Sequence, residues 1–132
     1  MVEPTYSIGE MSADFDVTAR TLRFYEYKEL LSPIRDGQKR LFTTACRARL
    51  SLILRGKRFG FSLDEIKDLL DLYEVGDGQV TQLSATLDVA EKHHARLIAQ
   101  RDELTEAIKD LEDQMRMTRG LLVEKGGAQA AQ

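Results

Sequence analysis

The sequence predicts a mostly helical chain that contains one small β-hairpin and ends in a long helix. Three observations lead to this prediction. Capping motifs and glycine breaks delimit four short amphipathic helices before residue 75. A Gly-centred turn lies between two short extended segments after the second helix. From residue 80 onward, apolar residues recur at alternating steps of three and four, which is typical of a coiled coil.

The first two helices have clear start signals. Ser7 and Glu10 form a capping box, in which each side chain can bind the backbone N–H of the other residue. Thr18 can cap the second helix by accepting from the backbone of the residue three positions later. We expect this helix to run to about Leu30, because the ring of Pro33 cannot follow a helical residue without a clash.

The segment 35–42 predicts a two-stranded hairpin. Asp36 and Gly37 supply a left-handed turn, and glycine adopts that conformation without a Cβ penalty. Three apolar residues flank the turn, and we expect them to pin the hairpin to the core: Ile34, Leu41 and Phe42.

Two further helices follow the hairpin. The third opens near Thr43 and ends at Gly60, and its apolar positions form one buried face: Cys46, Leu50, Ile53 and Leu54. A second capping box, Ser62 and Glu65, opens the fourth helix. Its predicted buried side consists of Leu63, Ile66, Leu69, Leu70 and Tyr73. The segment 75–78 contains two glycines and predicts a linker.

The most regular part of the chain is the apolar seam from 80 to 122. A helix of that length is about 65 Å long and cannot bury its seam against a body of 75 residues. A second copy of the chain is the simplest partner. The predicted dimerisation residues are Leu83, Leu87, Leu97, Leu104, Ile108, Leu111 and Met115. The sequence thus divides into a domain at 1–75, a linker and dimerisation helix at 76–122, and a flexible tail at 123–132.

The charge of the chain is unevenly distributed. The net charge is −3 and the pI is about 5.4, which by themselves argue against a general nucleic-acid binder. Residues 20–58, however, carry eleven Lys and Arg against three Asp and Glu, a net charge of +8, while the remainder carries −11. A basic segment of this kind indicates a surface that binds phosphate.

The one cysteine, Cys46, cannot form a disulfide within the chain. We interpret it as a small buried hydrophobic residue in preference to a redox or metal-binding thiol. The N-terminus has no signal-peptide pattern and no apolar run is long enough to span a bilayer. These features predict a cytoplasmic protein without a membrane segment, and nothing in the sequence calls for a cofactor.

Several linked blocks resemble the MerR family of bacterial transcription regulators, over roughly residues 5–73. The blocks are Tyr6–Met11, Thr18–Glu26, Leu30–Pro33, Arg40–Phe42 and Gly60–Ile66. The resemblance implies a winged helix-turn-helix domain followed by an antiparallel coiled-coil dimerisation helix. It also implies a homodimer that binds double-stranded DNA at an inverted-repeat promoter operator, bends and untwists that DNA, and works with RNA polymerase. The chain departs from the family pattern at Phe24 and Lys39, where tyrosines are common.

A second resemblance concerns the helix-loop-helix block at 52–63 together with Leu72 and Tyr73. This block looks like the branch of the family that regulates the breakdown of branched-chain amino acids and fatty acids. The resemblance implies a small-molecule effector of the acyl-CoA type.

The second helix and the wing hold the candidate DNA contacts. The predicted DNA-binding residues are Thr18, Arg20, Thr21, Arg23, Tyr25, Lys39 and Arg40. Arginine can bind guanine or phosphate, and a helix start offers hydroxyl and N–H groups to phosphate. The alternative for Arg20 and Arg23 is a solvated helix face, and Tyr25 divides evenly between core packing and phosphate contact. Phe24 is predicted to be core. The other basic residues of the third helix are expected to assist DNA binding through direct contacts or through their electrostatic field alone: Arg47, Arg55, Lys57 and Arg58.

Other function classes find less support. No acid, base and nucleophile converge in the sequence, so we predict that the chain is not an enzyme. A helical adaptor would explain the coil but not the basic segment. A metal- or redox-responsive sensor remains an alternative, although adjacent His93 and His94 do not form a chelating pair and His93 is predicted to be solvated. His94 and Arg101 interrupt the seam, where they can fix register or line an anionic effector site.

Overall fold

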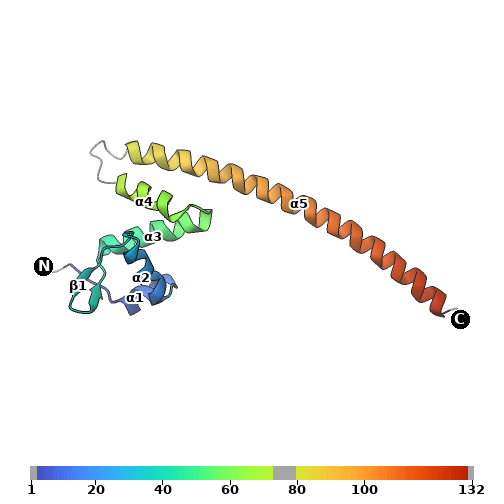
Figure 1. Ribbon diagram of the computed structural model, residues 1–132, viewed down its shortest axis with the longest axis horizontal. Coiled ribbons are helices and arrows are strands. Elements are labelled where there is room, and N and C mark those ends of the chain that lie inside the picture. Colours follow the sequence, from blue (N-terminus) through green and yellow to red (C-terminus); the bar gives the residue numbers. More distant parts are fainter. Residues whose placement is uncertain (1–2, 73–79, 131–132) are drawn as a thin grey trace. The chain divides into compact units, whose positions relative to one another are not determined.

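The computed structural model describes residues 3–72 and 80–130 (Figure 1). The helices are α1 (Ile8–Phe15), α2 (Ala19–Tyr27), α3 (Thr44–Phe59), α4 (Leu63–Asp71) and α5 (Val80–Ala130), and the strands are β1 (Ile34–Asp36) and β2 (Lys39–Leu41). The predicted fold class, a helical chain with a small β-hairpin and a long last helix, is confirmed. The chain divides into two units, Met1–His93 and His94–Gln132, which are described separately.

Side-chain caps fix the starts of the helices in the first unit as predicted. Ser7 Oγ accepts from the backbone N–H of Glu10 at 3.0 Å, and the Glu10 carboxylate accepts from the backbone N–H of Ser7 at 3.0 Å. Thr18 Oγ1 accepts from the backbone N–H of Thr21 at 3.0 Å. These bonds satisfy amide groups that have no partner inside a helix, and so place the helix starts locally.

Helix α2 ends earlier than the sequence predicted. Its last residue is Tyr27, and Glu29 adopts a left-handed conformation with φ of 62°. The backbone N–H of Leu30 then donates to the Tyr25 carbonyl at 2.9 Å. The physical reason is burial, since Leu30 and Leu31 are both fully enclosed and the chain must turn inward to bury them. Pro33 lies beyond this turn and does not set the helix end.

The hairpin has the predicted tight turn. Ile34 pairs with Leu41 and Asp36 with Lys39, and Gly37 has φ of 62°. The expectation that Ile34 anchors the hairpin was wrong, because this side chain is 53% exposed. Phe42 is the anchor. It is fully buried, and its backbone N–H and carbonyl each bond to those of Tyr6 at 2.8 Å.

The core of the first unit lies among α1 to α4. Most of the predicted positions are in it, and its buried members are Met11, Leu22, Tyr25, Leu30, Leu31, Phe42, Cys46, Leu50, Ile53, Phe61, Ile66 and Leu70. Leu54, Leu63 and Leu69 pack against it from partly buried positions. The predicted contribution of Tyr73 and the predicted linker at 75–78 lie outside the described residues.

The first turns of α5, residues 80–93, belong to the first unit and contact α4 through a face that the sequence did not reveal. His93 is 5% exposed, and its Nε2 lies 3.0 Å from Glu65 Oε1 in the α4 capping box. Gln82 Nε2 donates to the Leu69 carbonyl at 2.9 Å. The prediction that His93 is solvated was therefore wrong. Positions 82, 86, 89 and 93 lie on one face of the helix. Three of these four residues are polar, so a search for regularly spaced apolar residues does not detect this buried face.

Helix α5 is continuous over 51 residues and extends to Ala130. The helix thus continues through residues 123–130, where the sequence predicted a flexible tail. Gly126 and Gly127 lower the helix propensity by about 1 kcal/mol each. A glycine ends a helix efficiently only in the left-handed conformation, and neither of these two has a positive φ.

Candidate nucleic-acid interface

Arg20 and Arg23 stand on the exposed face of α2. Both are exposed, and within residues 3–72 and 80–130 neither takes part in an ion pair. Leu22 and Tyr25, on the opposite side of the same helix, are buried in the core. Because the buried side fixes how α2 sits on the body, both guanidinium groups are free to meet a ligand outside the protein.

The start of α2 adds further polar groups on this side. Thr18 caps the helix, and its hydroxyl lies 2.8 Å from the hydroxyl of Thr21. A helix start with unpaired N–H groups and neighbouring hydroxyls favours an anion such as phosphate. Thr18 is exposed and Thr21 is half-buried, so both can reach the surface.

Glu26 links α2 to the hairpin, which forms the wing. Its two carboxylate oxygens lie 2.7 Å from Arg40 Nε and 3.5 Å from Arg35 Nη1. Arg35 and Arg40 face each other across the two strands. Like charges at directly opposed positions destabilise a hairpin. One carboxylate between them removes this penalty and holds the wing beside α2.

The wing therefore presents its predicted contacts unequally. Lys39 is exposed and, among the described residues, has no ion-pair partner. The Arg40 side chain is only 22% exposed and its Nε is engaged by Glu26. The geometry makes Arg40 first a positioning residue for the wing, with its terminal nitrogens left for other contacts.

The adjacent aromatic residues Phe24 and Tyr25 of α2 lie in different environments. Phe24 is 44% exposed, so its prediction as a core residue was wrong. It lies two positions after buried Leu22, about 200° around the helix, and Lys28 Nζ sits 5.7 Å from its ring centre. Tyr25 is buried, and this burial raises the pKa of its phenol above the ordinary value of 10.0. Its position is that of a core residue with a protonated hydroxyl.

Two arginines of α3 are committed inside the protein. The Arg47 guanidinium stacks on the rings of Tyr6 and Phe15, at 4.4 and 5.0 Å from their centres, and pairs with Asp14 at 2.8 Å. Arg49 Nε donates to the Leu30 carbonyl at 2.9 Å. The sequence analysis counted Arg47 among the basic residues that act through their field or through contacts, and nothing in the helical period reveals that α1 covers this position.

The other basic residues of α3 lie near its C-terminal end. Arg55, Lys57 and Arg58 are exposed. Lys57 and Arg58 occupy the last turn, where positive charge interacts favourably with the helix dipole. The interaction with the helix dipole explains the position of these two residues, and their charges also add to the positive potential of the basic segment.

Within residues 3–72 and 80–130, three or more His, Cys, Asp or Glu side chains nowhere gather as a metal site would require. Among the described helices, none combines the length and apolarity of a bilayer crossing. Cys46 is buried, as expected, and its sulfur lies 3.4 Å from the Thr43 hydroxyl and 3.7 Å from the Ser32 carbonyl.

Comparison with protein families decides between the classes that this arrangement allows. The family model described as "MerR HTH family regulatory protein" matches residues 6–72, and the model described as "MerR, DNA binding" matches residues 47–114. The chain belongs to the MerR family. The first match covers α1 to α4 with the wing, and the second extends from α3 into α5. MerR members are transcription regulators, in agreement with the prediction that the chain is not an enzyme.

Two curated MerR-type relatives show how the similarity is distributed. The HTH-type transcriptional activator mta of Bacillus subtilis is 41% identical over 68 residues, which are 50% of this chain and only 26% of mta. The HTH-type transcriptional regulator HmrR of Rhizobium leguminosarum bv. viciae is 31% identical over 107 residues, which are 80% of this chain and 81% of HmrR.

Two solved MerR structures share the architecture. HiNmlR, a MerR family regulator lacking the sensor domain, was solved bound to promoter DNA. It is 28% identical with a TM-score of 0.62, and the alignment covers 78% of this chain and 80% of HiNmlR. The transcription regulator PbrR691 from Ralstonia metallidurans CH34, in complex with lead(II), is 33% identical with a TM-score of 0.61. That alignment covers 83% of this chain and 84% of PbrR691.

Proposed function

We propose that this MerR-family chain binds double-stranded promoter DNA as a homodimer and regulates transcription. The observation that carries the proposal is the state of α2. Arg20 and Arg23 are exposed and form no ion pair within the described ranges, while other arginines of the basic segment are committed internally. A helix that keeps two arginines free beside a fixed wing suits the major groove.

Each residue of the interface has a different part in this proposal. Arg20 and Arg23 contact base edges or phosphates, and Thr18 and Thr21 bind a phosphate at the start of α2. Lys39 contacts the DNA backbone from the wing. Arg40 and Tyr25 support these contacts mainly by position, because Arg40 is held by Glu26 and Tyr25 is buried.

The second copy is supported by the exposed seam of α5. Large apolar side chains recur along it without cover, and those predicted to meet the partner are Leu83, Leu87, Leu97, Leu104, Ile108, Leu111 and Met115. Pairing through this seam would hold two α2 helices at a fixed separation, so the operator should be an inverted repeat. The similarity to a regulator bound to promoter DNA supports the same arrangement.

The proposed mechanism follows from the resemblance to the MerR family. The dimer would bend and untwist a promoter in the cytoplasm, so that the energy of DNA deformation contributes to recognition. RNA polymerase would act on the distorted promoter, and an effector would change the distortion. Genes of branched-chain amino-acid or fatty-acid breakdown are the proposed targets, on the resemblance of residues 52–63.

The test begins by selecting an operator for the wild-type chain from random duplexes. Arg20→Ala and Arg23→Ala should each weaken binding to it by roughly 5- to 150-fold, corresponding to about 1–3 kcal/mol. Arg119→Ala, an exposed arginine of α5 far along the sequence, is the matched control and should leave affinity within about twofold. Unchanged affinity in folded, dimeric Arg20→Ala and Arg23→Ala variants would rule out the proposed role of α2.

A metal-responsive sensor is the second candidate, since PbrR691 is similar and was solved with lead(II). The thiol of this chain, Cys46, is buried between α3 and Ser32. Dialysis of the chain against copper, zinc or cobalt, followed by metal analysis, separates the two. Stoichiometric uptake with a change in operator affinity would favour the sensor, and lack of uptake would remove it.

A further inference from the structure

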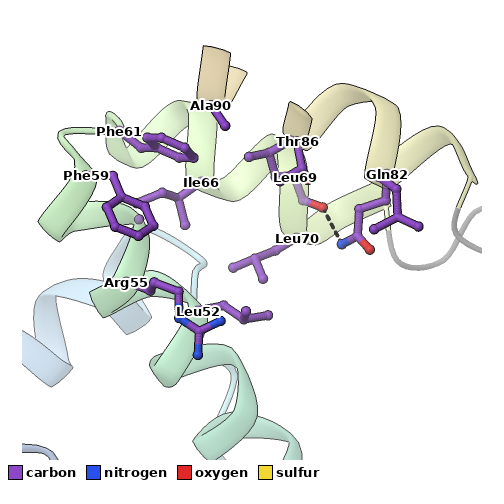
Figure 2. A pocket seen from close by; sticks show the side chains of 12 residues that line it. Leu52, Arg55, Phe59, Phe61, Ile66, Leu69, Leu70, Gln82, Thr86 and Ala90 are labelled. Atoms are coloured by element: carbon purple, nitrogen blue, oxygen red, sulfur yellow. Dashed lines mark hydrogen bonds between the residues drawn. The ribbon is translucent and has the colours of Figure 1, made fainter. Parts of the chain in front are cut away.

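A cavity of about 260 Å³ lies within the first unit, between α3, α4 and the first turns of α5. Figure 2 shows the rings of Phe59 and Phe61 on one side, with Thr86 and Gln82 of α5 across from them. The lining is predominantly apolar, with Ile66 and Leu70 of α4 among its members. A cavity of 150 Å³ in a protein core can hold benzene, so this one suits a molecule of about ten non-hydrogen atoms.

Two features of the sequence create this space. Helices α3 and α4 touch at Gly56, where a Cβ would lie 2.9 Å from Ile66 Cγ1, so α3 and α4 form a closed floor. On the side of α5, Thr86 and Ala90 are too small to fill the gap that their neighbours leave. An apolar ligand in this space would gain dispersion contacts with the side chains around it.

The lining also contains one cation, Arg55. Its side chain is exposed, and within residues 3–72 and 80–130 no carboxylate pairs with it. In Figure 2 it lies at the edge of the lining next to Leu52. An apolar pocket with an arginine at its edge suits a ligand that has an apolar body and one anionic group.

We propose that this cavity binds a small apolar carboxylic acid, whose body fills the space and whose carboxylate pairs with Arg55. The proposal rests on the proposed function and deepens it. A ligand held between α3, α4 and α5 would connect two helices that pack beside α2 in the first unit to the start of the dimerisation helix, and is placed to act as the effector. Gln82 and Thr86 lie on the stripe that faces α4, and Leu83, a predicted seam residue, also lines the cavity. Pairing of two seams would therefore bring the second copy beside the cavity at Leu83, so an occupant of the cavity would also lie next to the partner.

The test is isothermal titration of the full chain, without DNA, with 4-phenylbutanoate and with its uncharged counterpart 4-phenylbutanamide. We expect saturable binding of the acid at one site per chain. Arg55→Gln should weaken binding of the acid by about tenfold and leave that of the amide nearly unchanged. Thr86→Phe should fill the cavity and abolish binding of both, while Ser84→Phe, exposed on α5, should leave both unchanged.

Three outcomes would overturn the proposal. Absence of saturable binding by wild type excludes the acid site. Equal loss of acid and amide affinity in Arg55→Gln excludes anion recognition. If neither probe binds and Thr86→Phe instead breaks the dimer in sedimentation, the cavity is an interface with a second copy. Because no DNA is present, each of these results leaves the Arg20 test of DNA binding intact.

Discussion

The two units of the chain differ in whether they bury their own apolar side chains. The first unit encloses its apolar residues around Leu22, Leu50 and Ile53, which have no measurable exposure. In the second unit, no side chain described between 94 and 127 is buried, although Leu104, Ile108 and Leu111 are among them. Most helical stability in proteins comes from the packing of an apolar face and not from intrinsic propensity. The first unit therefore has a core of its own, whereas the apolar seam described in the second unit has no cover from its own chain.

The largest effect is expected from charged substitutions in the apolar seam of α5. Leu104→Glu combined with Ile108→Glu would bury like charges between two copies. We expect the dissociation constant of the dimer to rise by at least about 100-fold, corresponding to roughly 3 kcal/mol, with a loss of helical circular dichroism. Sedimentation and circular dichroism measure both effects.

The matched control changes exposed, charged positions of the same turns, Glu103→Gln and Lys109→Gln. These should leave the dimer intact. A double-glutamate variant that stays dimeric would show that α5 associates through a different face, or that it does not need a partner.

A core substitution tests the other side of the comparison. Leu50→Ala removes buried methyl groups of a fully enclosed side chain and should lower the free energy of unfolding of the first unit by about 2–5 kcal/mol. Urea unfolding followed by the near-UV signal of the tyrosines reports on this unit. The dimer should persist in sedimentation, and coupled loss of both would show that the units do not behave independently.

A smaller effect is expected at the junction of α2 and the wing. Glu26→Gln leaves Arg35 and Arg40 opposed without a compensating charge, and should destabilise the first unit by about 1 kcal/mol. The loss should diminish at high salt, because salt screens the repulsion. Glu29→Gln is the control, since Glu29 is exposed. A thermal shift that is equal in the two variants would contradict the role of Glu26.

The smallest effect concerns pH and the contact of α4 with α5. The hydrogen bond from the Ser62 backbone, followed by the contact with His93, lowers the pKa of Glu65 below its ordinary value of 4.5. A carboxyl whose pKa is lower in the folded state contributes stability above 4.5, and that stability is lost as the pH falls through the folded value. The melting temperature of Glu65→Gln should therefore fall less steeply on acidification than that of wild type. Parallel pH profiles would argue against the contribution.

Much of the secondary structure could be predicted because its signals are local. The caps at Ser7, Thr18, Thr43 and Ser62 each act within three residues, and the turn at Gly37 depends on its own backbone. Errors arose where burial overrode local preference. Helix α2 ended early so that Leu30 and Leu31 could enter the core, and neither propensity nor Pro33 signals that turn.

The sequence predicted the type and the location of the candidate site, but it did not predict which of its basic residues are free and which are paired. The basic segment and the start of α2 pointed to Arg20, Arg23 and the wing. A count of basic residues could not distinguish free cations from Arg40 and Arg47, which are paired with carboxylates of the same chain. The prediction that Phe24 is a core residue failed for a related reason. An aromatic side chain without a polar group is expected to be buried, and only the packing of α2 shows which of its faces points away from the core.

By itself the sequence determined the helix starts, the wing turn, the basic segment and the unbroken seam of α5, because each of these is encoded in residues close together along the chain. Tertiary structure decided which charges are available. Glu26 meets Arg40 across 14 positions, His93 meets Glu65 across 28, and Arg47 meets Asp14 across 33. Attraction between charges depends on distance in space, and only the packing of α1 to α5 brings these groups together.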